Sequence, residues 1–359
     1  MAKKSALRPR LRVASLFSGA GGLDLGFKRA GVQIVWANEF DRSIWATFEA
    51  NFPRTNLDRR SISEIDATEL PDCDGLIGGP PCQSWSEAGA RRGISDGRGK
   101  LFMDYMRVLA EKDPLFFLAE NVPGILFERN RRAFWKILSG FSKLGYNVSY
   151  GLLNASHFGV PQDRERVIIV GYRSDTDLFF VPPSPEQTRP SLKTAIWDLR
   201  NSALPDSRTN NSTRQPRLPN HHYMTGGLSM IYMSRNRVRP WDQPSFTIQA
   251  SGRHAPLHPQ APPMEIVGPD KRRFVRGKEE LYRRLTVREC ARIQTFPDDF
   301  EFRYRSINDG YKMVGNAVPV ELARRLARKI SRDLADVPRR PRRRRKHGAV
   351  KRFESEDLG

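Results

Sequence analysis

The stretch RVASLFSGAGGLDLGF, residues 12–27, decides the fold class of this chain. Its first six residues form an apolar run that is typical of a buried strand. Residues 19–22 read Gly-Ala-Gly-Gly, and Leu23 and Phe27 then follow at helical spacing. A strand that passes through a glycine-rich turn into a helix is the opening unit of an α/β fold whose ligand binds at the turn.

The alternation of apolar strands and helical stretches continues along the first half of the chain. Further strand-like runs lie at 32–37, 75–77, 115–119, 148–153 and 167–172. Strands that alternate with helices predict a doubly wound, mostly parallel sheet. In such sheets ligands bind beyond the carboxyl ends of the strands, and the glycine turn, Glu39, Cys82 and Glu120 all follow strand ends.

The sequence changes character after residue 174. Residues 175–265 are rich in Pro, Asn, Ser and Arg and show no long helical period, which returns at 287–294 and 320–334. We therefore predict three regions. They are a main α/β domain formed by 1–174 and 301–335, a smaller irregular domain over 175–300, and a basic, disordered tail over 336–359 that includes the run RRPRRRR.

The composition points to a nucleic-acid partner. The 359 residues carry a formal net charge of +21, and nucleic acid is the polyanion that such a protein would bind. The chain has no apolar run of about 18 residues and no signal-peptide pattern at its start, so we expect no membrane contact. Three cysteines without paired spacing argue against a disulfide framework and favour a reducing compartment.

A carboxylate and a departure from the dinucleotide-binding pattern indicate which ligand the glycine turn holds. Glu39 lies 20 residues after Gly19, at the end of the next strand, where it can accept hydrogen bonds from ribose hydroxyls. The third glycine of the dinucleotide fingerprint is replaced by Asp24, which would repel a pyrophosphate at the start of the helix. A cofactor without phosphates, such as S-adenosylmethionine, therefore fits better. The alternative is a glycine turn with a purely structural role.

A second group of interest surrounds Cys82, within the sequence GGPPCQSWS at 78–86. Glycines and prolines before the cysteine predict a rigid loop at a strand end, which is a suitable place for a nucleophile. A lone cysteine is more often buried and inert. Cys73 and Cys290 lack any comparable frame, and we predict structural roles for both.

Charged residues lie at the ends of two other strands. Glu120 ends an apolar strand and is either a site acid or a salt-bridged surface residue. Strand alternation puts Arg164 and Arg166 on one face, where they suit a phosphate or a base carbonyl; a solvated strand edge is the alternative. His254 and His258 are separated by a proline, which argues against a helical metal-binding pair, so we expect no metal.

Six motifs occur in the order that is typical of one enzyme family. They are FSGAGG at 17–22, GPPCQS at 79–84, ENV at 120–122, QDRER at 162–166, RECARIQ at 288–294 and GNAVP at 315–319. Over residues 12–330 the chain resembles the DNA (cytosine-5) methyltransferases, and among them the bacterial type II modification enzymes. The resemblance implies an S-adenosylmethionine-dependent catalytic domain at 1–174 and 301–335 and a DNA-recognition domain at 175–300.

The resemblance also implies roles for single residues. Cys82 would be the nucleophile that attacks cytosine, Glu120 the acid that contacts cytosine N3, and Arg166 with Arg164 the arginines that hold the base. The target base would leave the helix, because stacking blocks the ring face that the nucleophile must reach. The implied cofactor-binding residues are Phe17, Gly19, Ala20, Gly22, Glu39, Phe40, Ser61, Ile62, Leu101, Asn316 and Val318.

One cofactor position departs from the family pattern. Ser61 stands where the family usually has an aspartate that accepts a hydrogen bond from the adenine amino group. A serine can accept this bond but carries no charge. Either cofactor affinity is lower, or Asp58 or Asp66 takes the role.

The irregular region resembles that of enzymes that modify the sequence GGCC, in the segments 233–239 and 249–253. Arginine reads guanine O6 and N7, and contacts to phosphate alone are the alternative. The expected DNA-binding residues are Arg235, Arg237, Thr247 and Arg253. The expected partners are double-stranded DNA and a restriction endonuclease that shares the site. We expect the protein to be a monomer, to lie in the bacterial cytoplasm and to associate with the nucleoid.

Three other functions compete with this interpretation. A transfer-RNA cytosine methyltransferase on the same fold would have a much reduced recognition region, whereas 175–300 is long. A non-catalytic DNA-binding relative would not need Cys82 and Glu120. A nicotinamide-dependent dehydrogenase would need the third glycine that Asp24 replaces.

Overall fold

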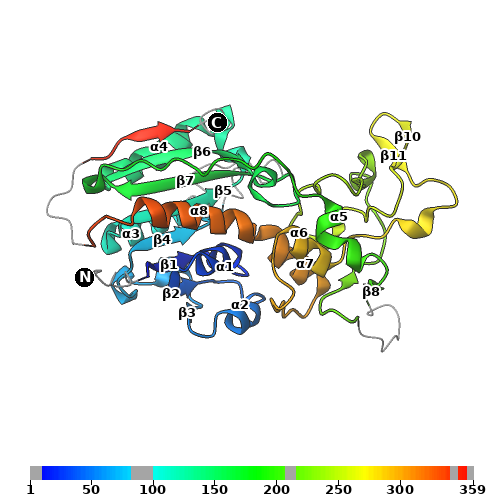
Figure 1. The fold of residues 1–359 in the computed structure, drawn as a ribbon, viewed down its shortest axis with the longest axis horizontal. Coiled ribbons are helices and arrows are strands. Elements are labelled where there is room, and N and C mark those ends of the chain that lie inside the picture. The colour runs from blue at the N-terminus through cyan, green and yellow to red at the C-terminus, as the bar shows by residue number, and fades with distance from the viewer. Residues whose placement is uncertain (1–9, 82–99, 207–215, 340–346, 354–359) are drawn as a thin grey trace, which may run out of the picture.

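The computed structural model describes residues 10–81, 100–206, 216–339 and 347–353. Within these ranges an eight-stranded sheet has the order β12-β6-β7-β5-β4-β1-β2-β3 (Figure 1). The strands of this sheet are β1 Arg12–Leu16, β2 Gln33–Asn38, β3 Asn56–Asp58, β4 Gly75–Gly78, β5 Phe116–Asn121, β6 Tyr146–Asn154, β7 Glu165–Arg173 and β12 Val350–Arg352. The predicted doubly wound, mostly parallel sheet is confirmed, and every predicted strand is present.

Strand β7 is the exception to the parallel order. It runs antiparallel to both of its neighbours, β5 and β6, whereas the other neighbouring strands of the sheet are parallel. The first residues of β7 therefore lie beside the last residues of β5, with Val167 opposite Asn121. This reversal brings Arg166 to the edge of the sheet at which Glu120 ends its strand.

Helices cover both faces of the sheet. The helices of the main domain are α1 Gly22–Arg29, α2 Trp45–Asn51, α3 Lys100–Lys112, α4 Arg131–Lys143, α7 Ile307–Asn316 and α8 Val320–Asp333. Helices α1 and α8 share a core with Ile168 and Val170 of β7, and α3 and α4 share another with Val167 and Ile169, because successive side chains of a strand point to opposite faces. No helix in the described ranges is long and apolar enough to cross a membrane.

The region between β7 and α7 is irregular, as predicted, and extends away from the sheet in Figure 1. Its elements are α5 Leu192–Ile196, α6 Val287–Ile293, β8 Leu204–Pro205, β9 His222–Tyr223, β10 Glu265–Gly268 and β11 Lys271–Arg273. Side chains of α5 and α6 share a core with Phe48 of α2 and Val314 of α7. A separate small core contains Tyr232, Val238 and Leu257. Helix α6 therefore anchors the irregular region to the main domain.

The C-terminal segment differs from the predicted disordered tail over 336–359. Strand β12 adds to the edge of the sheet in parallel with β6, and Phe353 is buried against Gly151. The Ser142 hydroxyl of α4 donates to the Gly348 carbonyl at 2.6 Å, which holds the chain before β12. Val350 and Phe353 each contribute to a core. Burial of the apolar residues that follow the basic run stabilises this edge strand. The prediction of a disordered tail rested on the basic run and did not take these apolar residues into account.

Candidate active site

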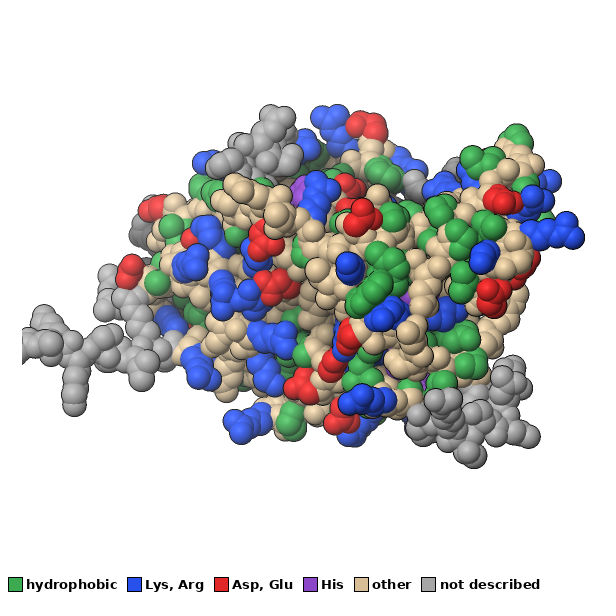
Figure 2. All heavy atoms as spheres, turned by 45° about the vertical axis from the view of Figure 1, so that its right-hand side comes forward, with side chains coloured by type: hydrophobic (Ala, Val, Ile, Leu, Met, Phe, Trp, Pro, Cys, Tyr) green, Lys and Arg blue, Asp and Glu red, His purple; other side chains and the backbone are tan. Residues whose placement is uncertain are grey.

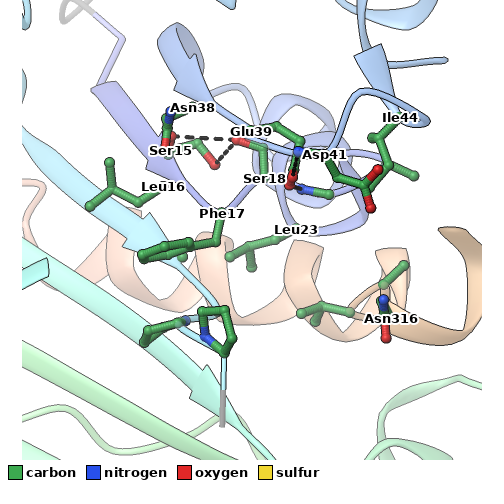
Figure 3. A pocket seen from close by; sticks show the side chains of 18 of the residues that line it. Ser15, Leu16, Phe17, Ser18, Leu23, Asn38, Glu39, Asp41, Ile44 and Asn316 are labelled. Carbon is green, nitrogen blue, oxygen red and sulfur yellow. Dashed lines mark hydrogen bonds between the residues drawn. The ribbon is translucent and has the colours of Figure 1, made fainter. Parts of the chain in front are cut away.

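A cavity of about 690 Å³ lies at the carboxyl ends of β1, β2, β4 and β5. Other parts of its wall come from the end of α7, the loop before α8, Ser61, Ile62 and Leu101. Figure 3 shows it from close by, with Phe17, Glu39 and Asn316 among the side chains around it. Parallel α/β sheets bind their ligands at this edge. The cavity therefore lies where the sequence predicted a ligand site.

The glycine-rich turn forms one wall because two of its positions tolerate only glycine. Gly21 has a φ of 87°, in the left-handed region, and caps the start of α1. A Cβ atom on Gly22 would lie 2.5 Å from the carbonyl oxygen of Val318, so the backbone of α1 packs directly on the loop before α8. The two halves of the main domain, which are far apart in the sequence, therefore meet beside the cavity.

Glu39 links the ends of β1 and β2. One carboxylate oxygen accepts a hydrogen bond from the Gly19 amide at 2.9 Å, and the other accepts one from the Asp41 amide at 2.7 Å. Burial raises the pKa of Glu39, and these two backbone bonds oppose the rise. A carboxylate held in this way has further lone pairs that can accept hydrogen bonds from hydroxyl groups of a ligand.

Asp24 is a buried carboxyl group in the same wall. Burial raises its pKa to about 7; the nearby Ser15 hydroxyl opposes this rise, and the charge of Glu39 adds to it. Neither carboxylate oxygen has a hydrogen bond of normal geometry among the described residues. A buried, unsatisfied carboxylate is costly, and a positively charged ligand in the cavity would reduce that cost.

All of the predicted cofactor positions line this one cavity. They are Phe17, Gly19, Ala20, Gly22, Glu39, Phe40, Ser61, Ile62, Leu101, Asn316 and Val318. They come from five separate parts of the chain, and the fold brings them together. Phe40 is 70% exposed, which leaves its ring free at the rim.

Ser61 retains its place in the cavity wall, and the two acids considered as substitutes do not take it. Asp58 forms an ion pair with Arg60 at 2.7 Å, and Asp66 accepts a hydrogen bond from the Thr68 amide at 2.9 Å. Neither acid is among the described residues that line the cavity. Of these three residues, only Ser61 lines the cavity, and its contact with the adenine amino group stays a prediction.

Glu120 and Arg166 form a largely buried ion pair at the cavity. Arg166 Nε lies 2.7 Å from Glu120 Oε1, and each side chain is 11% exposed. Glu120 itself lines the cavity. A Cβ atom on Gly79 would lie 3.1 Å from Glu120 Oε2, so the glycine leaves room for the carboxylate. The arrangement orients an acid towards the space in which a ligand would bind.

Cys82 lies outside the described residues. The chain that leads to it is described up to Pro81, and both Pro80 and Pro81 line the cavity. The Asn121 side chain donates a hydrogen bond to the Pro80 carbonyl at 3.1 Å, which ties the end of β5 to this loop. The catalytic role of Cys82 stays a proposal, and the anchoring by Asn121 is a contact that the sequence did not predict.

Arg164 does not reach the cavity, contrary to the predicted contact with the substrate base. Its guanidinium is buried and donates hydrogen bonds to the carbonyl oxygens of Ile248, Gly315 and Ala317 at 2.9, 2.8 and 3.0 Å. Among the described residues it is not part of the cavity wall. Alternation placed Arg164 and Arg166 on one face of the strand, but only the second faces Glu120, because Arg164 precedes β7 and packs against the loop before α8.

The predicted DNA-binding residues fall into two pairs. The side chains of Arg235 and Arg253 are exposed and make no hydrogen bond or ion pair within the described residues. Arg237 instead donates to the Tyr232 carbonyl at 2.9 Å and stacks on the Tyr232 ring, and the Thr247 hydroxyl donates to the Asp163 carbonyl at 2.6 Å. Figure 2 shows Lys and Arg side chains spread over the visible face of the molecule.

One charged pair in the cavity wall was not predicted. Lys312 of α7 forms an ion pair with Asp41, which follows β2, and both residues line the cavity. The two residues are far apart in the sequence, so no local pattern could connect them. The described residues contain no cluster of three or more His, Cys, Asp or Glu side chains arranged to hold a metal ion.

Comparison with known proteins assigns the chain to a family. A family profile for C-5 cytosine-specific DNA methylases matches residues 11–332. The type II methyltransferase M.FnuDI of Fusobacterium nucleatum is 55% identical over 330 residues, which cover 91% of this chain and 96% of that protein. The type II methyltransferase M.MthTI of Methanothermobacter thermautotrophicus is 55% identical over 327 residues, which cover 90% of this chain and 98% of that protein.

The fold agrees with this assignment. A DNA modification methyltransferase encoded within an Escherichia coli prophage has a similar solved structure, with a TM-score of 0.70 at 26% identity, over 91% of this chain and 100% of that chain. Sequence and fold therefore agree over almost the whole length. The chain belongs to the C-5 cytosine-specific DNA methylase family and is a DNA (cytosine-5-)-methyltransferase.

Proposed function

We propose that this enzyme transfers the methyl group of S-adenosylmethionine to C5 of a cytosine in double-stranded DNA, within the site GGCC, through a covalent adduct with Cys82. The observation that carries the proposal is the shared cavity. Glu120 lines the same cavity as all of the predicted cofactor positions, and the chain passes from its wall at Pro81 directly into Cys82.

The side chains of the cavity fit S-adenosylmethionine. Glu39 would accept hydrogen bonds from the ribose hydroxyls, and the apolar surfaces of Phe40 and Ile62 suit the adenine ring. The carboxyl group of Asp24, buried without a hydrogen bond of normal geometry, complements a ligand that carries positive charge. When it is bound, this cofactor supplies an electrophilic methyl group on a positively charged sulfur.

The residues of the chain would activate the cytosine. The Cys82 thiolate attacks C6 of a base that has left the helix and forms an S–C6 bond. Electron density moves to N3, which takes a proton from Glu120. Glu120 gives this proton from its protonated form, and the contact with Arg166 Nε holds the side chain in place for the transfer.

The second half of the reaction restores the ring. The activated C5 takes the methyl group, and a base then removes the C5 proton. The electron pair of the broken C–H bond re-forms the C5–C6 double bond, the S–C6 bond breaks, and Cys82 leaves as a thiolate. Loss of the N3 proton to Glu120 completes the cycle.

The exposed arginines supply candidates for reading the site. Arg235 and Arg253 are free to reach guanine O6 and N7 in the major groove, whereas Arg237 and Thr247 hold the backbone that presents them. The net charge of +21 adds attraction to DNA phosphates that weakens with salt. The proposal includes protection of DNA from a restriction endonuclease that shares the site, by a monomeric enzyme in the cytoplasm, associated with the nucleoid.

The proposal is tested by trapping the adduct. The protein is incubated with S-adenosylmethionine and a duplex that carries 5-fluorocytosine within GGCC, and the products are separated under denaturing conditions. Fluorine at C5 cannot leave as a proton does, so a covalent protein–DNA complex is expected to persist. Mass analysis of the digested complex should place the link on the peptide that contains Cys82.

Three controls separate the parts of the proposal. Cys82→Ser should give no adduct, and an equal yield would disprove the covalent mechanism. A duplex with a scrambled site should give little adduct, and equal trapping there would reject GGCC alone. A transfer RNA that carries 5-fluorocytosine should give none, and preferential trapping of the RNA would overturn the choice of DNA as substrate.

A further inference from the structure

The guanidinium of Arg164 joins three parts of the molecule. It donates from Nη1 to the carbonyl of Ile248, in the irregular region, at 2.9 Å. It donates from Nη2 to the carbonyls of Gly315 and Ala317 at 2.8 and 3.0 Å. The side chain is 1% exposed. A planar, forked donor can satisfy these separate acceptors at once, which a lysine ammonium on a single atom cannot do with the same geometry.

A second set of side-chain bonds joins the same elements. Gln162 donates to Gln294 at 2.9 Å and accepts a hydrogen bond from the Ile248 amide at 2.8 Å. Gln294 in turn donates to the carbonyls of Val314 and Ala317 at 3.0 and 3.3 Å. Both backbone groups of Ile248 are therefore held by side chains of the segment 162–164, and the Ala317 carbonyl accepts bonds from both sets.

The backbone that Arg164 holds belongs to two functional surfaces. Asn316 and Val318, on either side of Ala317, line the cavity that we assign to the cofactor. Thr247 precedes Ile248 and is itself bonded to the Asp163 carbonyl. A ligand that orders the loop at 316–318 therefore acts on the same guanidinium that holds the irregular region at Ile248.

Burying the charged guanidinium of Arg164 costs free energy, which its hydrogen bonds to the connected carbonyls offset. Burial lowers the pKa of its guanidinium well below the usual value, the positive charge of Arg166 adds to this, and Glu120 opposes it. The described residues provide it with no direct ion pair, and its Nε has no partner among them. Its charge is balanced mainly by the carbonyl oxygens that it connects, so its stable position depends on those carbonyls staying together.

We propose that Arg164 is a positioning residue that couples cofactor binding to DNA binding. Occupation of the cavity orders the loop at 316–318, and Arg164 transmits this order to Ile248. DNA then binds an irregular region in which the segment around Ile248 is already ordered, so DNA binding costs less conformational entropy. By the same coupling, bound DNA favours cofactor binding. The inference rests on the proposed function, because it takes the cavity as the cofactor site and the irregular region as the DNA site.

The test measures coupling and not activity. The Kd for a GGCC duplex is measured by fluorescence anisotropy, with and without saturating S-adenosylhomocysteine. For the wild type we expect the product to tighten DNA binding by about fivefold or more. For Arg164→Lys we expect the ratio to fall below about twofold, with both ligands still bound.

Arg288→Lys is the matched control. Arg288 is also 1% exposed, and its guanidinium also donates to three backbone carbonyls, those of Pro219, Pro297 and Phe300. None of these carbonyls belongs to the cavity wall or to Ile248. A loss of coupling in Arg164→Lys with the wild-type ratio in Arg288→Lys supports the inference. An unchanged ratio in Arg164→Lys, or an equal loss in both variants, overturns it.

A measurement on the wild type covers the case in which Arg164→Lys fails to fold. Hydrogen exchange of the Ile248 amide, which donates to Gln162, should slow when S-adenosylhomocysteine binds in the absence of DNA. Unchanged exchange in the presence of bound product would refute the coupling. Failure of the proposed function is a different result, since the protein would then bind neither the product nor the duplex, or would form no adduct.

Discussion

Arg166 Nε lies 2.7 Å from Glu120 Oε1, and the antiparallel pairing of β7 with β5 creates this contact. The ion pair fixes the direction of an acid that lines the proposed reaction cavity. A glutamine at position 120 would keep the size of the side chain but could not deliver a proton. We therefore predict that Glu120→Gln lowers the single-turnover rate of methyl transfer by about 10²- to 10⁴-fold.

The exposed neighbour Glu165 provides the control for this prediction. Glu165→Gln should keep the wild-type rate, because its side chain faces solvent. Cofactor binding, measured by calorimetry, should show that Glu120→Gln is folded. A Glu120→Gln rate within a few-fold of the wild type would exclude proton donation by Glu120.

Ser61→Asp should tighten cofactor binding. Ser61 lines the cavity, and neither Asp58 nor Asp66 does, so a carboxylate at position 61 would add charge to a neutral hydrogen bond. A charged acceptor is worth about 1 kcal/mol more than a neutral one, or about fivefold in Kd. Aspartate can also keep the role of Ser61 as N-cap of the short helix at Ile62–Glu64.

Calorimetric titration with S-adenosylmethionine measures this effect. Ser61→Ala serves as the comparison, and it should bind the cofactor more weakly than the wild type because it removes the acceptor. Equal or weaker binding by Ser61→Asp would show that position 61 does not face the adenine amino group.

The buried carboxyl group of Asp24 should make stability depend on pH. Burial raises its pKa from 3.8 to about 7, so between these values the folded chain keeps a proton that the unfolded chain has released. Stability therefore falls as the pH rises through this window, and the loss is complete above pH 7, on the order of 4 kcal/mol. Asp24→Asn removes this loss, and its advantage over the wild type should grow by about 3 kcal/mol from pH 5 to pH 8.

Urea unfolding of both proteins at several pH values measures this difference. Asp72, which is almost fully exposed, provides the control, and Asp72→Asn should keep a constant difference from the wild type. A constant difference for Asp24→Asn over the same range would mean that Asp24 does not titrate as its burial requires.

Phe353→Ala should destabilise the fold although it lies beyond the segment that matches the family profile, which ends at residue 332. Phe353 is buried against Gly151 and Phe180. Removing a buried phenylalanine side chain typically costs about 3–5 kcal/mol. The free energy of unfolding from urea titration measures the loss.

Lys351→Ala, on the same strand, is the comparison for Phe353→Ala. Lys351 is exposed, and its ammonium group lies over the ring of Phe179. Truncation of this side chain to alanine should therefore lower the free energy of unfolding by less than about 1 kcal/mol. Equal and small effects of both substitutions would indicate that the C-terminal strand adds nothing to the fold.

The sequence by itself determined the strand ends and the residues that follow them. The glycine turn, Glu39 and Glu120 could be placed at one edge of a sheet, because apolar runs and their breaks are local patterns and parallel strands share one ligand-binding edge. The family resemblance predicted that Phe17, Glu39 and Asn316 bind one cofactor. In the structure all three line one cavity.

The tertiary structure alone decided which partners these residues meet. Periodicity assigns a residue to a face of a strand but not to a neighbour, so Arg164 and Arg166 looked equivalent in the sequence. The reversed direction of β7 places Arg166 beside Glu120. Arg164 instead donates to the carbonyls of Ile248 in the irregular region, Gly315 in α7 and Ala317 in the loop before α8. Strand β12 depended in the same way on an open sheet edge at β6. Such contacts join residues that are far apart in the chain, and their free energy exists only once the strands have taken their order and register.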